Sequence, residues 1–241
     1  MRVLVQQGGC PPGGWEAGKR LSLDDGEVHH LRVRRAKDRD WVEILDGAGL
    51  RASGQLVQQG RGWMVEIGPV EREGPPPDLT LAVGAGDRER FSWLVEKAVE
   101  LGVTRIVPLE TEHTVGVATR LKQSHLPRLR RTVLDALKQC GSAWAPTIDE
   151  LFSLDRFLQR PRAAHSWLAE QTGATVPVEL DSTPLTILVG PEGGFTERER
   201  AQVLEAGYSP MTFGAHTLRF ETAALAAAAL VSQARLRRSH A

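Results

Sequence analysis

Short apolar runs alternate with segments of helical apolar spacing along most of the chain. In 88–101, for example, Phe91, Leu94 and Ala98 recur every three to four residues, as on one face of an amphipathic helix. This pattern predicts helices over 88–101, 126–140, 196–206 and 220–236, and strands over 79–83, 105–109, 163–168, 186–189 and 210–213. Strands that alternate with helices are typical of an α/β fold with a mostly parallel sheet covered on both faces.

The first part of the chain is predicted to be mostly β-structure. Trp41–Leu45 alternates between apolar and polar residues and runs into Asp46-Gly47, a dipeptide typical of tight hairpin turns. The pattern predicts strands over 41–45, 50–57 and 63–70, and one basic helix over 26–36. The simplest assembly of these elements is a small β-barrel with one helix.

Three consecutive prolines mark the clearest break, in Glu73-Gly74-Pro75-Pro76-Pro77-Asp78. Because proline cannot continue a helix or a central strand, this segment is expected to be a stiff, extended connector. We therefore predict a first domain over 1–72, a linker over 73–78 and a second domain over 79–241.

The composition excludes several classes of protein. The chain of 241 residues has 30 basic and 30 acidic residues, so no global field indicates a nucleic-acid partner. Its two cysteines, Cys10 and Cys140, lie far apart and lack metal-ligand spacing, which predicts a reducing compartment and no metal site. No apolar run approaches the roughly 20 residues that span a bilayer, and no signal-peptide pattern opens the chain. We expect a cytoplasmic protein without a membrane partner.

Two loops carry the strongest candidate chemistry. The first, Leu188–Phe195, joins a predicted buried strand to a predicted capped helix, and its glycines would let backbone groups approach a ligand. A tight strand-to-helix turn is the alternative. The second, Phe213–Ala224, places Arg219 and Glu221 at the start of a nearly all-apolar helix. Because unpaired buried charge is costly, these two residues either pair with each other or address a substrate.

Together the two loops resemble those of the bacterial 16S rRNA uridine N3-methyltransferases of the SPOUT superfamily. The resemblance rests on Gly-Pro-Glu-Gly-Gly-Phe at 190–195 and Leu-Arg-x-Glu-Thr-Ala at 218–223. In addition, Gly86-Asp87-Arg88 and the following 96–103 look like the family's first methyltransferase helix, and Gln139-Cys140-Gly141 looks like its Glu-Gln-Cys-Gly-Arg segment. The early hairpin after a basic helix is similar to the family's PUA-like RNA-binding domain.

The resemblance implies a methyltransferase domain with a deep trefoil knot, a homodimer, and a substrate uridine in the 16S rRNA of the 30S subunit. It implies that the two loops grip S-adenosylmethionine, mainly through backbone groups. Carried over residue by residue, the cofactor contacts are Leu188, Gly190, Pro191, Gly193 and Gly194, then Gly214, Leu218, Arg219, Glu221, Thr222 and Ala223, with Leu168, Ala169 and Glu170 as a third wall.

Several positions depart from the family pattern. Lys138 and Ser142 flank Gln-Cys-Gly where the family has Glu and Arg, and Ala85 stands where a basic residue is usual. Ala215-His216 replaces Pro-Arg, and Phe220 replaces Thr. We expect these changes to affect RNA contacts or dimer packing more than the reaction.

Methylation of N3 requires a weakly acidic nitrogen to lose its proton while negative charge builds on the flanking carbonyl oxygens. We predict Arg219 as the donor that stabilises this charge. Glu221 is the working choice of base, and the sequence does not separate it from Glu192 or His216. The predicted RNA contacts are Arg32, Arg34, Arg35, Lys37 and Arg39, continued by Arg128, Arg130 and Arg131.

Two other functions compete with this prediction. A dinucleotide-dependent oxidoreductase is suggested by Gly84-Ala85-Gly86 after a strand and by Glu110 at the end of the next, but Arg88-Glu89 stands near the place of the third glycine. A non-catalytic RNA-binding or ribosome assembly factor with a degenerate knot is the second. Binding of S-adenosylmethionine, of NAD or of neither separates the three.

Overall fold

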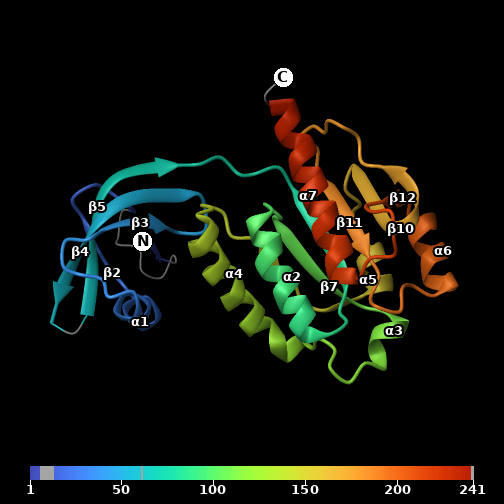
Figure 1. The fold of residues 1–241 in the computed structure, drawn as a ribbon, viewed down its shortest axis with the longest axis horizontal. Helices are drawn as coiled ribbons and strands as arrows, with labels where there is room; N and C mark the ends of the chain where they lie inside the picture. Colours follow the sequence, from blue (N-terminus) through green and yellow to red (C-terminus); the bar gives the residue numbers. More distant parts are fainter. Residues whose placement is uncertain (6–13, 61, 240–241) are drawn as a thin grey trace. The chain divides into compact units, whose positions relative to one another are not determined.

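The computed structural model describes residues 1–5, 14–60 and 62–239, which form two compact units (Figure 1). The first unit consists of Met1–Pro75 and Leu134–Ala145, and the second of Pro76–Val133 and Pro146–Ala241. The division between Pro75 and Pro76 falls inside the predicted linker. Nothing in the apolar periodicity predicts that 134–145 belongs to the first unit. Cys10 lies outside the described residues.

The first unit contains a five-stranded mixed sheet in the order β1-β3-β4-β5-β2. Its elements are β1 (Arg2–Leu4), β2 (Arg20–Ser22), α1 (Asp25–Val33), β3 (Trp41–Leu45), β4 (Leu50–Gln59) and β5 (Gly62–Arg72). β1 runs parallel to β3, and the other neighbours are antiparallel. The predicted helix and hairpin strands are confirmed, and the structure adds β1 and β2, whose three residues each are too few to show an alternation. No ladder joins β1 to β2 within the described ranges, so the barrel predicted for this part is present as an open sheet.

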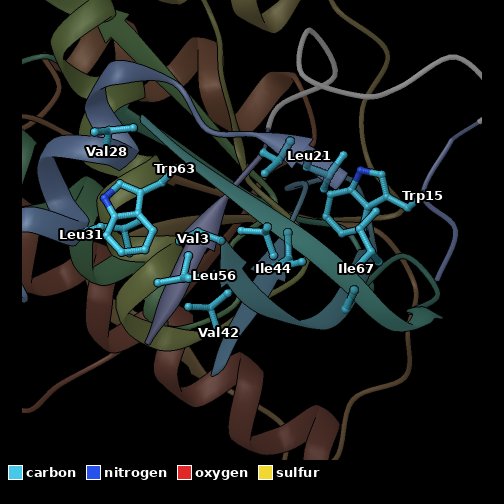
Figure 2. Close-up of a cluster of buried hydrophobic side chains, with 13 residues drawn as sticks. Val3, Trp15, Leu21, Val28, Leu31, Val42, Ile44, Leu56, Trp63 and Ile67 are labelled. Carbon is cyan, nitrogen blue, oxygen red and sulfur yellow. The ribbon is translucent and has the colours of Figure 1, made fainter. Parts of the chain in front are cut away.

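The core of the first unit lies between α1 and one face of this sheet (Figure 2). Val28 and Leu31 of α1 pack in one buried cluster with Ile44 of β3. The helix begins at Asp25 because the side chain of Asp24 accepts the N–H of Glu27 at 2.8 Å. The strand residues of the cluster are Val3, Leu21, Val42, Ile44, Ala52, Leu56, Trp63, Val65 and Ile67.

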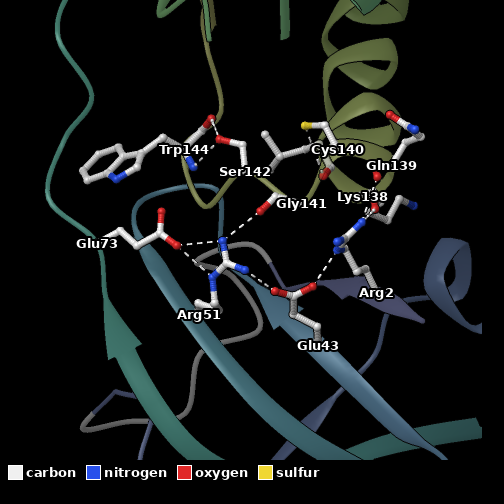
Figure 3. A network of polar contacts seen from close by, with 11 residues as sticks. Arg2, Glu43, Arg51, Glu73, Lys138, Gln139, Cys140, Gly141, Ser142 and Trp144 are labelled. Atoms are coloured by element: carbon white, nitrogen blue, oxygen red, sulfur yellow. Dashed lines mark hydrogen bonds and ion pairs between the residues drawn. The ribbon is translucent and has the colours of Figure 1, made fainter. Parts of the chain in front are cut away.

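An ion-pair network attaches 134–145 to the strands of the same unit (Figure 3). Glu43 on β3 accepts hydrogen bonds from Arg2 on β1, at 2.5 Å, and from Arg51 on β4. Arg2 also donates to the carbonyl of Gln139 at 2.8 Å, and Arg51 donates to the carbonyl of Gly141 at 2.9 Å. The arginines of this network are therefore occupied by structural contacts.

The second unit contains a seven-stranded sheet in the order β12-β10-β11-β6-β7-β8, with β9 also paired to β7. Its elements are β6 (Leu79–Gly84), α2 (Arg88–Glu100), β7 (Arg105–Glu110), α3 (Glu112–Val115), a 3-10 turn (Gln123–His125), α4 (Leu126–Cys140, which ends in the first unit), β8 (Thr147–Ile148), β9 (Phe152–Ser153), α5 (Leu154–Leu158), β10 (His165–Thr175), β11 (Leu185–Val189), α6 (Glu197–Glu205), β12 (Ser209–Thr212) and α7 (Phe220–Ser239). Every strand pairing here is parallel. The α/β class with a parallel sheet is confirmed, and the short elements α3, β8, β9 and α5 are additions.

Helices cover both faces of this sheet. Phe157 of α5 and Val203 of α6 share a buried cluster with Leu168 of β10 and Leu188 of β11. α7 contacts α2 as well as β6 and β11, and these two helices lie together over the other face (Figure 1). Because β12 is at the edge of the sheet, the chain must cross the carboxyl ends of β10 and β11 to place α7 there. This crossing positions the segment 213–219.

Candidate active site

The loops that follow β11 and β12 line one cavity of the second unit. β10 lies between these two strands and runs parallel to both, so all three strands end at the same edge of the sheet. The cavity at this edge has a volume of about 860 Å³. The predicted cofactor residues that line it are Ala169, Glu170, Gly190, Pro191, Gly193, Gly194, Gly214, Leu218, Arg219 and Ala223.

Four predicted cofactor residues are not among those that line the cavity. The side chains of Leu168 and Leu188 are completely buried in the cluster beneath α5 and α6, where they support the strands that end at the cavity. Glu221 is buried at the start of α7, and Thr222 beside it is exposed.

Glycines in the neighbouring strand end allow the first loop to approach closely. A Cβ on Gly84 would lie 2.5 Å from the backbone nitrogen of Pro191, and one on Gly86 would overlap the carboxylate of Glu192. Oε1 of Glu192 accepts the N–H of Asp87 at 3.1 Å. Contact with the loop therefore explains Gly84 and Gly86, the two glycines of the weak dinucleotide-binding pattern.

A histidine from α3 holds the other end of this loop. His113 Nδ1 lies 2.9 Å from the carbonyl oxygen of Gly194, as a hydrogen-bond donor would. A Cβ on Gly193 would lie 3.0 Å from the His113 ring, and Gly194 has a φ of 70°, where glycine is favoured. Close packing against His113 and the positive φ of Gly194 thus both favour glycine in this loop.

Glu221 pairs with a residue that the sequence analysis did not single out. Nη1 of Arg90, from α2, lies 3.1 Å from Oε1 of Glu221. The other carboxylate oxygen, Oε2, is buried and has no hydrogen-bond partner in the described part of the chain. Arg219 lines the cavity, and within the same residues its guanidinium has no ion-pair partner. The predicted alternative of an Arg219–Glu221 pair is therefore wrong.

Arg90 and Arg200 also line the cavity and were missed by sequence reasoning. Arg200 on α6 holds Glu170, in the middle of β10, with two hydrogen bonds, of 2.5 and 3.0 Å. Arg90 lies in the first turn of α2, where the backbone N–H that it donates to Asp87 holds the pKa of that carboxyl below its usual range. Helices that follow parallel strands begin at the carboxyl edge of the sheet, and this rule could have identified both arginines.

The predicted RNA contacts fall in both units. Arg32 is on α1, and the turn after it contributes four exposed residues, whereas Arg128 and Arg131 are exposed on the part of α4 that belongs to the second unit. The four exposed residues are Arg34, Arg35, Lys37 and Arg39. Arg130 donates to the carbonyl of Ile148 at 3.4 Å.

Two departures from the family pattern make packing contacts in the first unit. Nζ of Lys138 lies 2.8 Å from Oε1 of Glu27, and both side chains are largely buried. The hydroxyl of Ser142 shapes the following turn by accepting the N–H of Trp144 at 3.1 Å. Both residues therefore have a packing role within the first unit, and an effect on RNA contacts or dimer packing stays a prediction.

The other departures lie in the second unit. Phe220 stacks on Phe91 of α2, with ring centroids 6.5 Å apart. Ala215 and His216 are exposed, and His216 lines the cavity. Phe220 also lines the cavity and Ala215 does not, so His216 and Phe220 are the two of these residues that are placed to touch a ligand there.

Residues 1–5, 14–60 and 62–239 contain no group of three or more His, Cys, Asp and Glu side chains that could hold a metal ion. No helix within them is long and apolar enough to cross a membrane.

A family model described as an RNA methyltransferase domain matches residues 73–232. Among curated proteins, the ribosomal RNA small subunit methyltransferase E of Rickettsia conorii is 28% identical over 93% of this chain and 93% of its own length. The protein of the same name from Aquifex aeolicus is 28% identical over 86% of this chain and 91% of its own.

Solved structures give the same comparison. The ribosomal RNA small subunit methyltransferase E of Neisseria gonorrhoeae, bound to S-adenosyl methionine, aligns with a TM-score of 0.82 at 27% identity, covering 95% of this chain and 94% of that one. A probable rRNA-methyltransferase from Porphyromonas gingivalis aligns with a TM-score of 0.72 at 30% identity, covering 86% and 90%.

Proposed function

The chain belongs to the RNA methyltransferase family, and on that premise we propose that it methylates N3 of a uridine in 16S rRNA, with S-adenosylmethionine as the methyl donor. The observation that carries the proposal is the convergence of both glycine loops on one cavity. Relatives that are ribosomal RNA small subunit methyltransferases support the substrate, and the Neisseria gonorrhoeae structure supports the cofactor. We place the reaction in the cytoplasm, where small subunits are assembled.

The cavity fits S-adenosylmethionine in size and chemistry. Its volume of about 860 Å³ lies within the range of small-molecule sites. Phe195, Phe213 and Leu218 provide an apolar wall for a purine ring, next to the backbone groups of the glycine loops. The carboxylate of Glu192, which lines the cavity, supplies negative charge for a cationic ligand. When bound, the cofactor supplies an electrophilic methyl group on a sulfonium.

The side chains at the cavity can perform the rest of the reaction. Arg219 has no ion-pair partner within the described chain and so can donate to a uracil carbonyl oxygen as negative charge builds there. Glu221 is held by Arg90 and does not line the cavity, so we assign it a positioning role at the start of α7. The N3 proton then passes to a side chain that does line the cavity, the carboxylate of Glu192 or the imidazole of His216.

We propose the finer architecture on the same basis. The crossing of 213–219 over the strand ends supports a trefoil knot, and the small mixed sheet of the first unit supports a PUA-like RNA-binding domain. Trp93 on α2 and Leu230 on α7, exposed by 49% and 43%, support a homodimer that pairs through these two helices. Arg128 and Arg131 are proposed to extend the RNA contact.

The test is methyl transfer from labelled S-adenosylmethionine to purified 30S subunits that lack their own uridine methylation, with the product mapped by mass spectrometry. We expect one N3-methyluridine. Arg219→Ala should lower kcat roughly 100-fold and change cofactor affinity little, because it removes a donor needed as charge develops. Arg198→Ala is the matched control, since Arg198 is exposed on α6 and does not line the cavity.

Other outcomes would redirect the proposal. Cofactor binding without transfer to 30S subunits would contradict the substrate and move the search to another RNA. A chain that binds no S-adenosylmethionine would favour the non-catalytic RNA-binding or assembly factor.

A further inference from the structure

The turn between α1 and β3 concentrates positive charge that no carboxylate neutralises. Four cations of this turn are exposed, and none forms an ion pair with any residue that the structure describes. They are Arg34, Arg35, Lys37 and Arg39. By contrast, Arg20 of the same unit pairs with Glu66 at 3.0 Å. The turn is therefore a cluster of cations to which a polyanion can bind without breaking existing ion pairs.

The backbone of the turn adopts conformations that favour glycine. Arg35 has a φ of 55° and Arg39 a φ of 67°, and they are the only non-glycine residues with positive φ in the described ranges. The N–H of Arg39 donates to the carbonyl of Leu56 at 2.8 Å, which holds this shape against β4. Since glycine would fit both positions with less strain, the arginine side chains are retained at a cost to the backbone, which indicates a use for them.

The acidic residues of the turn bind backbone groups instead of the arginines. Asp40 accepts the N–H of Lys37 at 2.8 Å, and Asp38 accepts the N–H of Gln58 on β4 at 2.9 Å. These bonds fix the turn while the cationic side chains stay available. The cationic surface is thus formed before any ligand arrives.

An exposed indole follows the turn directly. Trp41, the first residue of β3, is 63% exposed, and it points away from the core because its neighbour Val42 is buried. It lines a cavity of about 1380 Å³ together with Arg34, His30 and Ser53, all within the first unit. A large flat aromatic face beside free cations is the combination that binds single-stranded nucleic acid.

The charges of this cavity are largely balanced, in contrast to those of the turn. Glu43 pairs with Arg2 and Arg51, and Asp135 pairs with Lys138 at 3.3 Å, which leaves Glu71 and Arg34 as the side chains of opposite charge without an ion pair among the described residues of its lining. Carboxylates accept hydrogen bonds from the N–H groups of a base. Phosphates are therefore directed to the turn and a base to the cavity.

We propose that Trp41 is a stacking platform for an unpaired base of the RNA, whose phosphates lie along the 34–39 turn. This inference rests on the proposed RNA substrate and adds that the first unit recognises a single-stranded segment. Duplex RNA presents no free base face to the indole and is expected to bind more weakly.

The test is fluorescence anisotropy of the full chain with a short unstructured oligoribonucleotide, compared with a duplex of the same length. Loss of base stacking in Trp41→Leu should weaken single-strand binding roughly 5- to 100-fold, and Trp41→Phe should retain most of it. Arg39→Gly should weaken binding and lower the salt slope by about 0.7, because one phosphate contact is lost. Its thermal midpoint should stay equal or rise, since glycine relieves the positive φ. Arg20→Gln, which loses a paired cation, is the matched control.

Two outcomes would overturn the inference. The first is that the single strand does not bind. The second is that Trp41→Leu leaves its binding unchanged and heparin competes with it, as expected for a surface that binds any polyanion. Calorimetry with S-adenosylmethionine on the same preparations separates this from the proposed function. Trp41-dependent RNA binding in a chain that takes up no cofactor would leave the inference standing and remove the methyltransferase.

Discussion

Lys138 and Glu27 offer the sharpest test of how the first unit is held together. Their Nζ and Oε1 atoms are 2.8 Å apart, and the side chains are only 12% and 7% exposed. Burial lowers the pKa of the Lys138 ammonium, but the hydrogen bond and charge of Glu27, helped by Asp135, outweigh it and raise that pKa above its usual value. The stability from this raised pKa is complete below the usual lysine range and is lost as the pH rises through the raised value. At neutral pH the pair is intact.

The perturbation is Lys138→Met, which removes the charge and keeps most of the length of the side chain. It leaves the Glu27 carboxylate buried without a cation, and Oε2 of Glu27 already lacks a partner among the described residues. Breaking a buried pair in this way costs about 3–5 kcal/mol, and partial access to water makes about 2–3 kcal/mol our expectation. Replacing both partners, in Glu27→Leu with Lys138→Met, should recover most of this loss because no charge remains buried.

The assay is urea unfolding of both single variants and the double variant at neutral pH, followed by circular dichroism. Hydrogen exchange of the α1 amides assigns the loss to the first unit. A coupling free energy near 2 kcal/mol is expected from the cycle. If Lys138→Met costs less than about 1 kcal/mol and the two changes are additive, the pair behaves like an exposed one and the reasoning from burial is refuted.

Three further predictions concern the second unit. Gly84→Ala should weaken S-adenosylmethionine binding in calorimetry and destabilise the unit by about 1–3 kcal/mol, because its Cβ meets the backbone of Pro191; unchanged binding would contradict the close approach. Arg90→Gln should cost about 1–2 kcal/mol in urea unfolding by leaving Glu221 without its cation, and an unchanged midpoint would show that the pair is solvated. Burial raises the pKa of Tyr208, the single tyrosine, to about 12. The stability that the neutral phenol contributes is therefore complete below about pH 10 and is lost towards pH 12. Phenolate absorbance that appears near pH 10 in the folded protein would contradict this.

The long elements were predictable because each shows its own periodicity. Helix 88–101 and strand 41–45 are found within one residue of their predicted ends. β1 and β2 were missed because three residues cannot show an alternation. The inclusion of 134–145 in the first unit was missed for another reason, since it depends on contacts between residues far apart in sequence, such as Arg2 with the carbonyl of Gln139.

The candidate site was predictable where backbone geometry defines it and unpredictable where ion pairs do. The glycines at 190, 193 and 194 indicated either a ligand loop or a tight turn between a strand and a helix, and the cavity forms around them. A charged side chain has many possible partners. The local sequence suggested an ion pair between Arg219 and Glu221, whereas Glu221 pairs with Arg90, on a helix that begins at the same edge of the sheet.

Two departures from the family pattern also depend on side-chain partners that the local sequence does not reveal. Lys138 is matched by Glu27, more than a hundred residues earlier, and Phe220 is matched by the stacked ring of Phe91. Each of these two departures therefore has a partner that keeps the local packing satisfied, and neither changes a glycine of the two loops. Considered without its partner, such a substitution suggests a change in RNA binding. Considered together with its partner, it indicates a change in the packing of the fold. Differences in RNA recognition should then be sought in side chains that have no such partner, such as Trp41 and the cations of the turn before it.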